Sequence, residues 1–127
     1  MDHYASGPVD PLDLHSRLAT AVTLYLAALG VWGLYLGLVG SGPSPSFRGA
    51  LVIVEAGIVV QGLAGALVWA EGGPPEWIHV LYGFALVLAL PLAFTVVREG
   101  SPRRAALTLG LASLFAMGLA IRGMTTA

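Results

Sequence analysis

Four long apolar segments, separated by short polar connections, make up most of the chain. They run over about 12–39, 47–70, 75–97 and 103–125. A membrane-spanning helix needs roughly 20 apolar residues, so each segment is long enough to cross a bilayer. The connections contain Gly, Pro and Ser, which end helices and start turns. Short connections make consecutive helices antiparallel, so the pattern predicts an all-α, integral membrane up-down four-helix bundle, with residues 1–127 forming a single domain.

The composition agrees with a membrane protein and excludes several kinds of site. The chain is 57% hydrophobic and 10% charged, which leaves too little charge to cover a soluble domain of this size. It has no Cys, which excludes disulfides, thiolate metal sites and covalent c-type heme attachment. A net charge of −1 gives no indication of nucleic-acid binding. The acidic and polar first residues do not resemble a cleavable signal peptide.

The arginines predict the orientation in the membrane, because cytoplasmic connections are enriched in Arg and Lys. Two connections on one side, which we assign to the cytoplasm, are flanked by Arg48, Arg98, Arg103 and Arg104. The other side holds Asp2, Asp10, Asp13, Glu71 and Glu76, with only Arg17 and Arg122. This distribution places both termini and the 71–75 connection outside. We expect a multi-pass protein of a bacterial or archaeal inner membrane.

Two histidines are the main candidates for chemistry. Asp10-Pro11 and Pro74-Pro75-Glu76 are typical helix starts, so His15 and His79 are predicted to lie one turn inside the first and third helices, at matching depth. Ionisable side chains inside a span are costly and usually functional. Two imidazoles that face each other across a bundle are the axial ligand set of a b-type heme. Independent structural roles, proton handling or another metal are the alternatives.

Residues near the histidines fit the same hypothesis. Ala19 and Gly83 each follow a histidine by four positions and would let a porphyrin approach the helix backbone, although small residues are common in membrane helices. Arg17 and Arg122 lie near the outer helix ends, where heme propionates would need cationic partners. Both arginines could instead extend to the lipid headgroups.

Three acidic or polar residues in or beside the spans leave several roles open. Glu76 precedes His79 by three positions and could hydrogen-bond the imidazole, contact a substrate or relay protons, so it is a tentative catalytic residue. It could equally be a first-turn acid that stabilises the helix dipole. Glu55 and Gln61 lie within the second span. Glu55 could be a proton site, a partner of Arg48 or a neutral, hydrogen-bonded group. We do not assign Glu55 to catalysis, because it lies far from the predicted histidine layer.

At these residues the chain resembles the heme A synthase family. The resemblance is carried by VVQGLAGALVWAEGGPPEWIHVLYGFALVLALPLAF (59–94) and DLHSRLATAVTLYL (13–26). Members are built from four-helix bundles, each with two outward-side histidines on alternate helices that ligate heme. The resemblance therefore implies that His15 and His79 hold heme b. It also implies a compact form with a single bundle, because full-length members have two.

The chain departs from the family pattern at several positions. Glu76 and His79 match the start of the family's E-x-x-H-R motif, but Val80 stands where Arg is expected. Near the other histidine, Arg17 is displaced by one position. The cysteine pair that many members carry in an outer loop is absent. The resemblance thus supports a b-type heme more strongly than it supports heme A synthesis.

The expected function is that of a membrane heme b protein with bis-His ligation, which either transfers electrons or oxidises a heme methyl group. One alternative is a small multidrug-type, proton-coupled transporter in which Glu55 binds the proton. Another is an accessory subunit of a larger respiratory complex. The bilayer is the expected partner, and the Gly33/Gly37 pair favours close helix packing, either within the bundle or in a homodimer. No nucleic-acid partner is expected.

Overall fold

The computed structural model describes residues 10–98 and 100–126, and within them it has four α-helices. These are α2 (Pro11–Leu38), α3 (Pro45–Gly72), α4 (Trp77–Val96) and α5 (Pro102–Thr125). All four are long and apolar enough to cross a membrane. The predicted all-α four-helix bundle is confirmed, and each helix end lies within about two residues of the predicted one. His3 and Asp2 lie outside the described residues.

The local sequence explains where the helices begin. Proline occupies the first position of α2, α3 and α5, where its missing N–H costs no hydrogen bond. The hydroxyl of Ser44 accepts a hydrogen bond from the Phe47 amide at 3.1 Å, and the hydroxyl of Ser101 accepts one from the Arg104 amide at 3.2 Å. These serines satisfy backbone donors that the first helical turn leaves unpaired.

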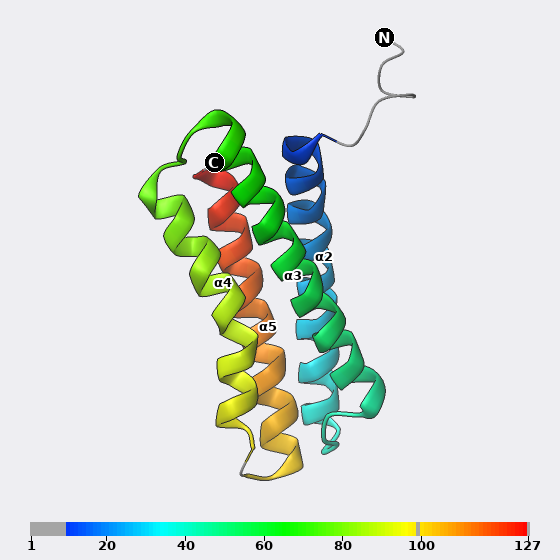
Figure 1. The fold of residues 1–127 in the computed structure, drawn as a ribbon. Coiled ribbons are helices and arrows are strands. Elements are labelled where there is room, and N and C mark those ends of the chain that lie inside the picture. The colour runs from blue at the N-terminus through cyan, green and yellow to red at the C-terminus, as the bar shows by residue number, and fades with distance from the viewer. Residues whose placement is uncertain (1–9, 99, 127) are drawn as a thin grey trace, which may run out of the picture.

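The helices run up and down around a ring, with α2 next to α3, α3 next to α4, α4 next to α5, and α5 next to α2 (Figure 1). Among the described residues, the diagonal pairs α2/α4 and α3/α5 have no Cα atoms within 8 Å of each other. The α2–α5 pair packs most extensively and the α3–α4 pair least. The start of α2 and the end of α5 lie at the same end of the bundle.

We call the two ends of the bundle the histidine end and the arginine end. The histidine end holds Asp10, the connection between α3 and α4, and Thr126. The arginine end holds the connections that follow Leu38 and Val96. Three of the four helices, α2, α3 and α5, have 24 residues or more, so the two ends stand roughly a bilayer thickness apart.

Small residues bring α2 and α5 together near the arginine end. A Cβ placed on Gly33 would lie 2.6 Å from the Gly110 Cα, and one placed on Gly37 would lie 2.3 Å from a Leu107 methyl carbon. Only residues without a side chain allow the two backbones to approach this closely. The predicted Gly33/Gly37 packing pair therefore serves contacts inside the bundle.

The exterior of the bundle is as apolar as its core. The fully buried side chains include Phe47, Leu26, Leu51, Leu90 and Leu109. Many large apolar side chains on all four helices nevertheless point outward with more than 60% of their area exposed, such as Leu24, Val31, Val52, Phe84 and Phe115. An exterior of this kind is suited to lipid rather than to water. The chain is a multi-pass membrane protein.

Candidate functional site

The two span histidines meet across the interior at the histidine end. His15 projects from α2 and His79 from α4, which are diagonal helices. Their ring centroids are 6.0 Å apart and their planes are inclined by 75°. Both side chains are partly buried. Since the backbones of α2 and α4 do not approach each other, the two imidazoles span the space between these helices.

Each imidazole is held by the helix that follows its own. The His15 Nδ1 donates a hydrogen bond to the Gln61 carbonyl of α3 at 2.9 Å. The His79 Nδ1 donates to the Gly123 carbonyl of α5 at 2.9 Å, with the Thr126 hydroxyl 3.3 Å away. A carbonyl oxygen can only accept, so the proton of each neutral ring lies on Nδ1 and the lone pair on Nε2. Histidines that ligate metals are usually oriented in this way.

Gly65 leaves room for the His15 ring. A Cβ on Gly65 would lie 3.0 Å from the His15 Cε1 atom and 3.3 Å from Nδ1. Both distances are shorter than ordinary van der Waals contacts, so a side chain at this position would push the ring away from α3. The ring lies in a notch on α3 made by Gly65, one turn from the carbonyl that binds it.

The small residues predicted to leave room for a porphyrin differ in their surroundings. Ala19 is buried, and its carbonyl accepts a hydrogen bond from the Thr23 hydroxyl at 2.7 Å. Gly83 is exposed, and a Cβ there would meet no described atom within 4 Å. Gly83 therefore borders open space, whereas Ala19 belongs to the packed core. Their roles beside a cofactor stay predictions.

The two outer arginines lie at different distances from the histidines. Arg17 follows His15 by two residues, about 200° around the helix. Its side chain is 80% exposed and forms an ion pair with Asp13 at 2.9 Å. The Arg122 guanidinium lies 5.9 Å from the centre of the Tyr82 ring, one turn from His79 on α4. Of the two, only Arg122 contacts α4, the helix that carries His79.

Glu76 is the N-cap residue of α4, and its carbonyl accepts from the His79 amide at 3.1 Å. Its side chain is exposed and makes no capping hydrogen bond. Within the described residues, Glu55 and Gln61 each have a buried Oε1 atom with no hydrogen-bond partner. Glu55 lies nearly three helical turns from Gly65 and six residues from Gln61 on α3.

Sequence reasoning identified the two imidazoles but missed what holds them. The carbonyls of Gln61 and Gly123 belong to the backbone, so no residue type marks them. Gly65 is one of several small residues in the second span, and no local pattern distinguishes it from the others. Only the pairing of α2 with α3, and of α4 with α5, shows which glycine faces which ring.

Residues 10–98 and 100–126 contain no group of three or more His, Cys, Asp and Glu side chains that could bind a metal ion by themselves. A pair of histidines is a sufficient protein ligand set only where another molecule supplies the remaining donors, as a porphyrin does. Comparisons of the chain with protein-family models, with curated proteins and with solved structures find no match. Function is therefore inferred from the residues themselves.

Proposed function

We propose that the chain is a membrane heme b protein in which His15 and His79 are the axial ligands. The observation that carries the proposal is the pair of imidazoles 6.0 Å apart across the interior. A ring nitrogen lies roughly 2 Å from a bound metal, so two imidazoles that share one metal from opposite sides have centres about 6 Å apart. The separation of the two rings fits such a pair.

The hydrogen bonds add independent support. Both Nδ1 atoms are bound to carbonyls, which leaves each Nε2 free to ligate iron. Each carbonyl also prevents its ring from turning, so that the ligand geometry is set before the cofactor binds. The partly buried rings and the apolar walls of the bundle limit access of water to the pair. Arg122 is the residue we expect to pair with a propionate, because it borders Tyr82 and α4.

When bound, a heme with two protein ligands supplies one-electron transfer. The chain provides one pair of histidines in its spans, enough for one such heme. An electron-transfer role therefore fits a single bundle better than heme methyl oxidation, which requires a second, substrate heme. The resemblance to the heme A synthase family agrees with this proposal, and we propose a bacterial or archaeal inner membrane as the location.

The test is the visible spectrum of the purified protein, recorded oxidised and reduced. The wild type is expected to give the α and β bands of a six-coordinate b-type heme, with about one heme per chain. His15→Ala and His79→Ala are each expected to lose most of the heme, because one imidazole alone binds the iron weakly. Heme content is measured by conversion to the pyridine complex. The histidine variant His3→Ala lies outside the spans and should retain full heme.

Two further measurements guard against misfolding as the cause of heme loss. Circular dichroism should show unchanged helix content in both alanine variants. His79→Met is expected to retain heme and to raise its midpoint potential, because a Met/His pair favours reduced iron. Full heme content and an unchanged spectrum in both alanine variants would exclude these ligands.

The transporter alternative rests on Glu55, whose Oε1 is buried without a hydrogen-bond partner in the described part of α3. A buried carboxyl oxygen of this kind suits a group that binds and releases a proton. This alternative predicts that Glu55→Gln abolishes proton-coupled uptake in vesicles, whereas the heme proposal predicts unchanged heme content in the same variant.

A further inference from the structure

A second candidate site lies at the arginine end, far from the histidines. It is a surface hollow of about 500 Å³. It is lined by Arg48, Phe94, Thr95, Val97 and Arg98. Arg48 belongs to the first turn of α3, and the other four lie at or just beyond the last turn of α4. The hollow therefore opens between α3 and α4, the neighbouring helices that pack least extensively.

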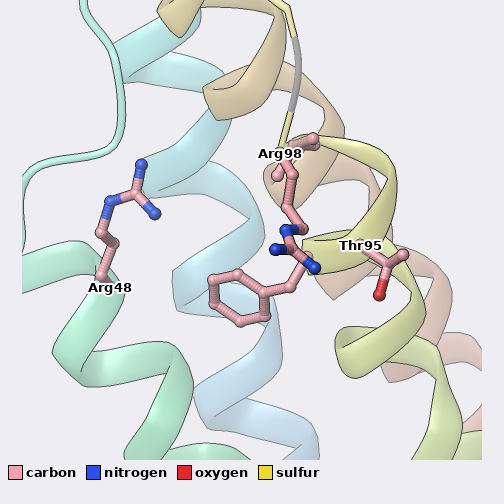
Figure 2. Close-up of a pocket in the computed structure, with 5 residues that line it drawn as sticks. Arg48, Thr95 and Arg98 are labelled. Carbon is pink, nitrogen blue, oxygen red and sulfur yellow. The ribbon is translucent and has the colours of Figure 1, made fainter.

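Two guanidinium groups face this hollow from different helices. Figure 2 shows Arg48 reaching from α3 on one side and Arg98 from the end of α4 on the other. Both side chains are exposed. Phe94 and Val97 are the apolar residues of the lining, and Thr95 donates its hydroxyl to the Pro91 carbonyl at 3.0 Å. The hollow thus combines two cations with apolar surface.

The other two arginines of the arginine end have different surroundings. Arg103 donates its Nε–H to the Gly37 carbonyl at 2.9 Å and so caps the last turn of α2. Arg104 follows in the first turn of α5 and is exposed. Neither lines the hollow. Arg48 and Arg98 are therefore the cations of this end that share one concave surface.

We propose that the hollow binds the headgroup of an acidic phospholipid. A guanidinium group pairs with phosphate oxygens through two parallel hydrogen bonds, and two such groups would fix one phosphodiester between α3 and α4. The hollow lies at the end of the apolar spans, where lipid phosphates are concentrated. Phe94 and Val97 offer an apolar surface to the first methylene groups of the acyl chains. The bound lipid would fill the gap between the least packed helices.

The test uses native mass spectrometry of the detergent-solubilised full chain. Short-chain phosphatidylglycerol, the matching phosphatidylcholine and inorganic phosphate are titrated separately. We expect phosphatidylglycerol to give one saturable adduct and the other two to give none at the same concentration. Arg48→Gln and Arg98→Gln should each weaken phosphatidylglycerol binding about tenfold, the effect of losing one charge-assisted pair. The matched control Arg104→Gln removes a charge from the same end without touching the hollow and should bind as the wild type.

Three outcomes would overturn the proposal. Equal binding of phosphatidylcholine, which carries the same phosphodiester but no net charge, would show that the hollow does not select an acidic lipid. Saturable binding of inorganic phosphate that competes with the lipid would make the hollow a site for a soluble anion. Equal weakening in all three arginine variants would mean that the total charge of the end, rather than this hollow, attracts the lipid. Circular dichroism of each variant verifies that the bundle is folded.

Discussion

Gly65 determines where the His15 imidazole can lie, because a Cβ at this position would meet the ring 3.0 Å away. Under the heme proposal, Gly65→Val should move the ring and lower heme affinity by about tenfold to a hundredfold, the usual effect of disturbing a group that orients a metal ligand. The measurement is heme content during titration with a competing heme-binding protein. Gly62→Val is the matched control, since a Cβ on Gly62 meets no described atom within 4 Å. Equal heme affinity in the two variants would contradict a requirement of the His15 ring for the space beside Gly65.

Helical geometry distinguishes the two outer arginines, Arg17 and Arg122. Both lie near an outer helix end, and the sequence pattern predicts the same role for each. An offset of two residues from His15 turns Arg17 away from the imidazole by about 200°. The ion pair with Asp13 agrees with that direction. The position of Arg122 beside Tyr82 depends on how α4 and α5 pack, which no local pattern encodes.

At the scale of elements, the α2–α5 contact depends on glycine. A Cβ on Gly33 would lie 2.6 Å from the Gly110 Cα, so Gly33→Ala must force the two helices apart. We expect it to destabilise the bundle by about 1–3 kcal/mol, the usual cost of overpacking. Gly62→Ala should be neutral or stabilise slightly, because alanine favours helix and the site is open. Unfolding in a mixed-detergent titration, followed by circular dichroism, compares the two. Equal stabilities would contradict a packed interface at Gly33.

The helices themselves were predictable because apolar length and Pro or Ser at the helix starts are local properties. The largest differences from the predicted starts are two residues, at α3 and α4. Helix α3 begins earlier because Ser44 caps it, and α4 begins later because Glu76 is still extended, with φ −62° and ψ 146°. The buried face of each helix was not predictable in this way. Core-facing and lipid-facing positions are both apolar, so the pattern does not identify which face of each span is buried.

At the scale of the whole molecule, the two halves repeat one arrangement. In α2–α3 and again in α4–α5, an early histidine of the first helix donates Nδ1–H to a carbonyl in the second half of the next helix. The residues joined are 46 positions apart in one half and 44 in the other. In the sequence, the halves share only an early histidine in the first helix of each, His15 and His79. The repeated hydrogen bond makes the two imidazoles equivalent partners at one end of the bundle.

Which face of the membrane the paired imidazoles occupy follows from the arginines. Arg48, Arg98, Arg103 and Arg104 lie at the end opposite to the histidines, and cytoplasmic ends are enriched in arginine. We therefore predict that the histidine end faces outward. Because the chain has no Cys, single cysteines can report the orientation without background labelling. Glu71→Cys, at the histidine end, should react with a membrane-impermeant maleimide in intact cells.

Ser41→Cys, at the arginine end, is the matched variant and should react only after the cells are lysed. Both positions are exposed in the structure, so a difference in labelling reports the side of the membrane rather than burial. The reverse pattern would place the imidazoles at the cytoplasmic side and would assign any electron donor or acceptor to that compartment. Labelling of both positions in intact cells would mean that the chain inserts in two orientations, as a modest arginine bias of four to two permits.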